Sequence, residues 1–180
     1  GDDALNVNVD KSYRRGVEIM ASWKTAKWLT LSGNVTLSQN RIQDYVDELR
    51  NSPTYGQNLG DMTISYSPSV MGAVTADFHV KGFGLIWNTQ YVGKQYFTNN
   101  EIEALSLDAY CVTNLDLGYT FKMCDDRSVR FGVVVNNLFS TLYESNGYGY
   151  SYMWDGVRYD EAFYFPQAPI NVLANITVNF

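Results

Sequence analysis

The chain has 180 residues, a formal net charge of −6 at pH 7, one histidine and 14 tyrosines. The negative charge argues against nucleic acid as a partner, because a phosphate backbone attracts basic surfaces. No apolar run approaches the roughly 18 residues that a membrane-spanning helix needs, but this leaves membrane-crossing strands open, since their alternating pattern gives a weak hydropathy signal. The first residues, GDDALNVNV, lack the basic start and apolar stretch of a signal peptide, so we expect any export signal to lie upstream.

Apolar and polar residues alternate along most of the chain, which is the period of β-strands. In each such segment the apolar residues share one face, and Ser, Thr, Asn and Gly dominate the other. Helical periodicity is weak throughout. The sequence therefore predicts an all-β, antiparallel fold of about seven strands, at residues 16–24, 28–38, 70–80, 83–94, 113–121, 129–138 and 170–180.

The predicted connections alternate in length. Because each antiparallel strand reverses direction, the short connections fall at one end of the sheet and the long ones at the other. A soluble sandwich has no physical reason for that asymmetry, whereas a transmembrane up-and-down β-barrel combines short turns on one side with long loops on the other. The short connections lie near 25–27, 81–82 and 122–128, and the long ones near 39–69, 95–110 and 139–168.

The two faces of the predicted strands differ in charge. The apolar rows carry no charged residue, and aromatic residues collect near the strand ends, as the interfacial girdles of membrane barrels require. We therefore expect the apolar rows to face lipid and the polar rows to face a watery lumen. The lumen-facing polar candidates are Glu18, Asp77, His79, Asp116 and Arg130, which would pair with each other or with another part of the protein.

The connection 139–168 contains a predicted β-hairpin that would project beyond the membrane. Asp155-Gly156 is a strong signal for a two-residue hairpin turn, and it separates two tyrosine-rich segments. Tyrosines give a large amphipathic contact area at a low entropic cost, so direct ligand contact is one interpretation. The other interpretation is that the rings pack within the hairpin and at the membrane interface. The ligand-loop candidates are Tyr143, Tyr148, Tyr150, Tyr152, Trp154 and Tyr159.

Signals for catalysis or metal binding are weak. His79 is the single histidine, no serine elbow accompanies it, and no Cys/His spacing suits zinc. The acidic residues of loop 39–69 match no EF-hand spacing, so a solvated loop is favoured over a calcium site. Cys111 and Cys124 would lie too far apart along one strand to form a disulfide. We expect no enzyme activity, no metal and no cofactor.

The last part of the chain resembles the C-terminal end of TonB-dependent outer-membrane receptors. In that family a strand ends in Asn-Leu-Phe, here Asn137 to Phe139, and a tyrosine-rich loop follows. A proline-containing run, here 165–169, then leads into a closing strand that ends in an aromatic residue, here Phe180. Segments earlier in the chain are similar to the preceding strands of the family: 91–100 and 107–121.

This resemblance implies a transmembrane barrel of about 22 strands with a plugged lumen. Residues 1–180 would be the C-terminal segment of that single barrel domain in the bacterial outer membrane, in contact with its lipid. The plug and the TonB box would belong to the N-terminal part of the receptor. Transport energised by the TonB complex would import a scarce small molecule, and ferric siderophore, cobalamin, haem and glycan all remain open.

The resemblance also implies an assembly role for the last strand. In outer-membrane barrels the assembly machinery reads a C-terminal aromatic residue that follows alternating apolar residues. The residues that match the assembly signal are Val172, Ala174, Ile176, Val178 and Phe180.

Two rival functions remain: a soluble, tyrosine-rich β domain that binds carbohydrate or protein at a cell surface, and a passive porin-type channel.

Overall fold

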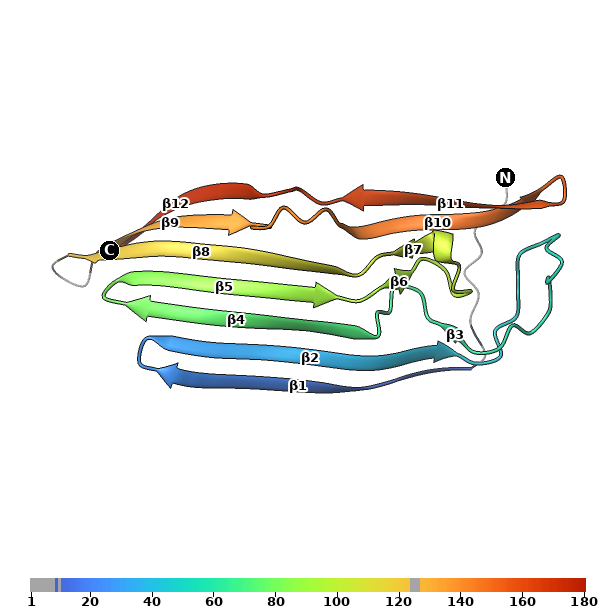
Figure 1. Ribbon diagram of the computed structural model, residues 1–180, viewed down its shortest axis with the longest axis horizontal. Helices are drawn as coiled ribbons and strands as arrows, with labels where there is room; N and C mark the ends of the chain where they lie inside the picture. Colours follow the sequence, from blue (N-terminus) through green and yellow to red (C-terminus); the bar gives the residue numbers. More distant parts are fainter. Residues whose placement is uncertain (1–8, 10, 124–126) are drawn as a thin grey trace.

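The computed structural model describes residues 9, 11–123 and 127–180. Seven long strands follow one another in an antiparallel sheet, in the order β1-β2-β4-β5-β8-β9-β12, and a short eighth strand, β3, pairs with β2 (Figure 1). This confirms the all-β, antiparallel prediction. The strands are β1 (Ser12–Ala26), β2 (Leu29–Ile42), β4 (Val70–Val80), β5 (Phe83–Val92), β8 (Tyr110–Lys122), β9 (Ser128–Asn136) and β12 (Asn171–Asn179).

Several strands are longer than the sequence predicts. β1 begins at Ser12, β2 continues to Ile42 and β8 begins at Tyr110. The first turn was also placed too early, because the register between β1 and β2 shifts at Thr25. Such a bulge absorbs one residue, so the chain turns after Ala26 rather than at Thr25.

The short connections lie at one end of the sheet and the long ones at the other, as predicted (Figure 1). Lys81 and Gly82 both have positive φ angles, of 47° and 87°, which suits a two-residue turn between right-twisted strands. The C-terminus lies at the short-turn end. The sheet is open in this chain, with β1 and β12 as its two edges.

The apolar rows of the seven strands share one face of the sheet. Opposed residues in adjacent strands point to the same face, and the register places Ile19 beside Val35 and Leu117 beside Val133. This face does not pack into a dry core, since Ile19 is 58% and Ile176 65% exposed. Its aromatic contacts gather toward the short-turn end: Trp28–Phe78, Phe78–Phe83, Tyr119–Phe121 and Phe121–Phe131.

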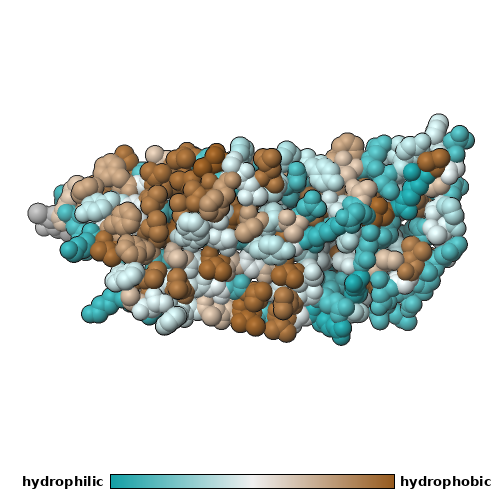
Figure 2. All heavy atoms as spheres, in the orientation of Figure 1, coloured by the Kyte–Doolittle hydropathy of each residue, from teal (hydrophilic) through white to brown (hydrophobic). Residues whose placement is uncertain are grey.

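The long connections carry their own short elements, which we call the outer loops (residues 43–69, 93–109 and 137–170). Hydrophobic residues gather over the sheet, whereas hydrophilic residues dominate the outer loops (Figure 2). No helix in the described part of the chain is long and apolar enough to cross a membrane. The elements are β3 (Met62–Thr63), β6 (Gln95–Tyr96), the 3-10 helix η1 (Glu103–Leu105), β7 (Ser106–Leu107), β10 (Glu144–Trp154) and β11 (Val157–Pro166).

Strands β10 and β11 form the predicted hairpin, which turns at Asp155 and Gly156. One face of this hairpin packs on a small core made by Phe97, Leu105 and Leu107. Glycines make this close approach possible: a Cβ at Gly147 would lie 2.7 Å from the Phe97 ring, and one at Gly149 would lie 2.7 Å from Leu105. The buried core of the chain therefore lies among the outer loops and not in the sheet.

Replacing Gly149 by valine should lift the hairpin from this core, because its side chain would overlap both Leu105 and the Glu161 carbonyl oxygen. We expect faster hydrogen exchange at the amides of β10 and β11 in the full-length protein, with β4 and β5 unchanged. Met153→Val is the matched control, since Met153 lies on the same face nearer the tip. Equal protection in both variants would contradict the packing described here.

Candidate functional site

We call the seven long strands of the sheet the wall. The charged candidates on these strands lie on the polar face of the sheet, opposite the apolar rows. Arg130 contacts Asp116 on the neighbouring strand, with Nη2 and Oδ1 2.6 Å apart. The Arg130 guanidinium lies over Gly118, where a Cβ would come within 2.5 Å of it. Two strand glycines, Gly118 and Gly132, thus leave the space that this ion pair occupies.

His79 and Asp77 form a second contact on the same face. The His79 Nδ1 lies 2.6 Å from the Asp77 Oδ1, which has no other polar partner in the described residues. Glu18 also lies on this face, and within the described residues no ion pair includes it. Four of the five charged candidates are therefore brought together as pairs.

Asn137, the first residue of the Asn-Leu-Phe motif, fixes the exit of the chain from β9. It is 3% exposed and adopts a left-handed φ of 51°. Its side-chain nitrogen donates to the carbonyl oxygens of Thr141 (2.9 Å) and Ala168 (3.1 Å), and its side-chain oxygen accepts from the Thr141 N–H (2.9 Å). Its own N–H donates to the Asn114 carboxamide at 2.9 Å. One side chain thus joins both ends of the long connection to the wall.

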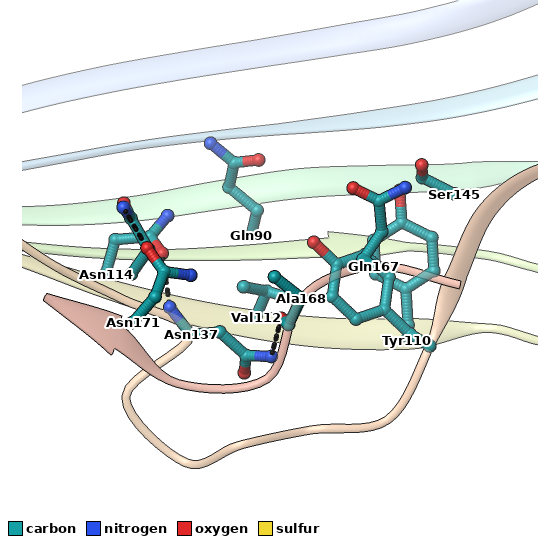
Figure 3. A pocket seen from close by; sticks show the side chains of 11 residues that line it. Gln90, Tyr110, Val112, Asn114, Asn137, Ser145, Gln167, Ala168 and Asn171 are labelled. Atoms are coloured by element: carbon teal, nitrogen blue, oxygen red, sulfur yellow. Dashed lines mark hydrogen bonds between the residues drawn. The ribbon is translucent and has the colours of Figure 1, made fainter. Parts of the chain in front are cut away.

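A polar pocket lies on the same face, where the wall meets the outer loops (Figure 3). We call it the carboxamide pocket, because six of its eleven lining residues are Asn or Gln. Its volume is about 390 Å³, within the range of small-molecule sites. The wall contributes Gln90, Tyr110, Val112, Asn114, Asn136 and Asn171. The outer loops contribute Asn137, Tyr143, Ser145, Gln167 and Ala168.

Hydrogen bonds to neighbouring side chains hold several lining residues of the carboxamide pocket in place. Asn136 donates to Asn171 at 2.9 Å, and Gln90 donates to Asn88 at 3.1 Å. The rings of Tyr110 and Tyr143 contact each other with centroids 4.5 Å apart and planes tilted by 33°. The predicted candidate Tyr143 therefore contributes to this pocket and not to the hairpin.

The remaining ligand-loop candidates form an aromatic ladder on the exposed face of the hairpin. Tyr148 stacks on Phe163 at 5.0 Å, and Tyr152 stacks on Tyr159 at 5.4 Å. The hydroxyls of Tyr150 and Tyr152 both donate to the Glu161 carboxylate at 2.8 Å. These hydrogen bonds raise the pKa of both tyrosines and lower the pKa of Glu161. Trp154 lies at the exposed tip.

The ladder rings pack against each other and still present their faces to solvent. Of the two interpretations of these tyrosines, the structure shows the packing of the rings within the hairpin, and their contact with a ligand stays a prediction. The hairpin itself is joined to the neighbouring connection by a hydrogen bond from the Tyr66 hydroxyl to the Gly147 carbonyl oxygen, 2.9 Å long.

Two carboxylates hold the outer loops together. Glu101 accepts from Arg41 and from the Thr63 N–H at 2.7 Å, which joins two of the long connections. Asp47 is 2% exposed and accepts from Thr54, Ser52 and the Leu49 N–H. Burial raises the pKa of both carboxyls, but these hydrogen bonds outweigh it and leave each pKa below its ordinary value.

The structure gives no metal site among the described residues, in which no group of three or more His, Cys, Asp or Glu side chains is placed to hold an ion. Both carboxylate oxygens of Asp47 accept hydrogen bonds from protein donors. Cys111 is free and exposed, and Cys124 lies outside the described residues.

Sequence reasoning missed most of the carboxamide pocket. Gln90, Asn114, Asn136 and Asn171 all lie at the outer ends of polar rows that the alternation identifies correctly. A search for carboxamides at the loop ends of adjacent strands would have found these four. Gln167 and Ser145 carry no such signal, because their position depends on the path of the outer loops.

Comparison with known proteins gives both a sequence and a structural match. The model of the family described as TonB dependent receptor-like, beta-barrel, matches residues 1–138. The siderophore receptor PiuA from Acinetobacter baumannii superposes with a TM-score of 0.69 at 13% identity over 93% of this chain. The ferric preacinetobactin receptor BauA from the same species gives 0.66 at 17% over 94%. The ferric yersiniabactin uptake receptor FyuA from Yersinia pestis gives 0.65 at 18% over 94%.

The chain spans 22% of PiuA and of BauA and 24% of FyuA. At these identities the structural likeness concerns the fold. The family model ends just after the start of the Asn-Leu-Phe motif, whereas the structural matches cover nearly the whole chain.

Replacing Asn137 by alanine should release the connection that it holds. Three side-chain hydrogen bonds are lost, and the carbonyl oxygens of Thr141 and Ala168 lose the donor that they share, so we expect the local opening free energy to fall by about 2 kcal/mol. Hydrogen exchange at the Thr141 amide measures this change, and Asn175→Ala on β12 is the control. Asn137→Gly removes the strain of the left-handed φ without restoring the bonds. A return to normal protection in that variant would show that strain, and not hydrogen bonding, dominates.

We also expect the outer loops to loosen in acid. Because the pKa of Asp47 and of Glu101 is lowered in the folded chain, the stability they contribute is fully present above the ordinary values of 3.8 and 4.5 and is lost as the pH falls through the lower folded values. Hydrogen exchange over residues 43–66, corrected for the intrinsic rate, should accelerate as the pH falls below 4.5 and then 3.8, relative to β4 and β5. Asp47→Asn should flatten the profile in residues 45–59. An unchanged profile in that variant would remove Asp47 as the cause.

Proposed function

The chain belongs to the family of TonB-dependent receptors, as the sequence predicted, and we propose that it forms a C-terminal section of the barrel of an outer-membrane transporter. In this proposal its seven long strands wall the path of a scarce small molecule, and its outer loops capture that molecule outside the cell. The plug and the TonB box would lie in the N-terminal part of the receptor. Import would be energised through the TonB complex.

One observation supports this proposal above the others: the uncharged apolar rows stay exposed across all seven strands. A soluble β domain would pack those rows into a dry core, as the rival interpretation requires, whereas a transmembrane barrel turns them toward lipid. The opposite face carries the ion pairs and the carboxamides, which suits a watery lumen. The aromatic contacts near the short turns fit an interfacial girdle.

The edges of the sheet also fit a section of a larger barrel. β1 and β12 each pair on one side only within this chain, and a closed barrel would satisfy both edges through further strands. The exposed row of β12, ending at Phe180, is the part that we propose the barrel assembly machinery reads.

We also propose a ligand class. The structural relatives named above are receptors for siderophores or their ferric complexes, so a siderophore-like molecule is the first candidate for this receptor. The passive porin-type alternative is disfavoured by the family, since its members are receptors coupled to TonB. Enzyme activity has no support in the site: the single histidine pairs with Asp77 on the wall.

Fractionation of cells that express the full-length protein tests the location. We expect recovery in the detergent-extracted outer membrane, with gel mobility that changes on boiling, and capture by the purified C-terminal domain of TonB. Ile19→Glu, on the lipid-facing row, should reduce the heat-modifiable form, because a charge there must enter hydrocarbon. Glu18→Gln, its neighbour on the polar face, is the control. Recovery in the soluble fraction without detergent would count against the transporter.

A further inference from the structure

We propose that the carboxamide pocket binds an uncharged, oxygen-rich ligand, such as a saccharide or a neutral metal chelate. The inference rests on the proposed transport function, because the pocket lies on the face that would line the path. It goes further by naming the chemistry that the path admits.

The first argument is the absence of charge. None of the eleven lining residues is Asp, Glu, Lys, Arg or His. The ion pair of Asp116 and Arg130 on the same face is already neutralised internally at 2.6 Å. An ionic ligand that leaves water for this pocket would lose hydration and find no opposite charge, which is unfavourable. An uncharged ligand meets no such penalty.

The second argument is the balance of donors and acceptors. A carboxamide offers both an N–H donor and a carbonyl acceptor, and a hydroxyl offers both on one atom. Within the described residues the Asn114 side-chain nitrogen, the Ser145 hydroxyl and the Tyr110 and Tyr143 hydroxyls have no protein partner. These groups match ligands that carry hydroxyl and carbonyl oxygens side by side. They match poorly a ligand that only donates or only accepts.

The third argument is that the pocket is built in advance. Asn137 makes three side-chain hydrogen bonds within the outer loop, and its N–H donates to the Asn114 carboxamide on β8. Asn136 and Asn171 hold each other across β9 and β12. The Tyr110 and Tyr143 rings, in contact at 4.5 Å, add an apolar surface beside the polar groups. A pocket that needs little rearrangement keeps more of its interaction free energy for the ligand.

Asn114→Asp is the sharpest variant, because it changes the chemistry and keeps the shape. The oxygen that accepts from the Asn137 N–H is retained, so the fold is preserved, while the free donor is replaced by a negative charge. Gln167→Glu makes the same change from the outer-loop side. Asn175→Asp lies on the same face of β12 outside the pocket and is the matched control.

Calorimetry on the full-length receptor in detergent would use charge-sorted probes. The panel combines an array of uncharged and acidic glycans with ferrichrome, an uncharged ferric hydroxamate, and ferric enterobactin, an anionic ferric catecholate. We expect saturable binding of an uncharged probe, either a glycan or ferrichrome. Which of the two binds shows whether the ligand is a saccharide or a neutral metal chelate. Asn114→Asp and Gln167→Glu should weaken that binding at least tenfold, with Asn175→Asp within twofold of the parent.

Three outcomes would overturn the inference. They are binding of the anionic probes alone, silence of every uncharged probe, and uncharged binding that both pocket variants leave unchanged. Heat-modifiable gel mobility checks that each variant is folded. Capture by the TonB C-terminal domain, measured on the same preparations, separates the two proposals: retained capture with failed binding removes the ligand class alone, and lost capture removes the transport function.

Discussion

Two faces of opposite character, held in register over seven strands, are the constraint on which the rest of this structure depends. Each backbone hydrogen-bond ladder fixes which residues oppose each other, and apart from the bulge at Thr25 the side chains then alternate between the faces. A slip of one residue at any strand would carry charges such as Asp116 into the apolar row and Leu117 out of it. The ion pairs, the carboxamide pocket and the exposed aliphatic rows all follow from that single alignment.

Much of the wall could be predicted from the sequence, because its signal is local and repeated. Alternation gives the face of every strand residue, and the lengths of the connections give the two ends. What alternation does not give is where a strand ends. β1 continues through Tyr13, Arg14 and Arg15, which are polar on both faces, because pairing with β2 supplies their hydrogen bonds and not because of any apolar pattern. The bulge at Thr25 was likewise invisible, since it depends on the partner strand.

The outer loops were harder, since their contacts join residues far apart in the chain. The hairpin was predictable from Asp155-Gly156, and so was the common face of its tyrosines. Its packing on Phe97 and Leu105 was not, because the enabling residues are Gly147 and Gly149, and a glycine in a strand carries no sign of what will approach it. Asn137 is predictable as part of the Asn-Leu-Phe motif, but its hydrogen bonds to Thr141 and Ala168 are not, because they depend on the path of the loop after β9.

The glycine side of the hairpin has a consequence for how such a receptor can evolve. Within the described residues the hairpin packs on Phe97 and Leu105 through the face that carries Gly147 and Gly149, whereas the ladder rings on the other face pack on one another. Substitutions of the ladder residues should therefore change the stability of the sheet little, so these positions can vary in sequence. The same scaffold can be retained by descendants that meet quite different molecules in their surroundings.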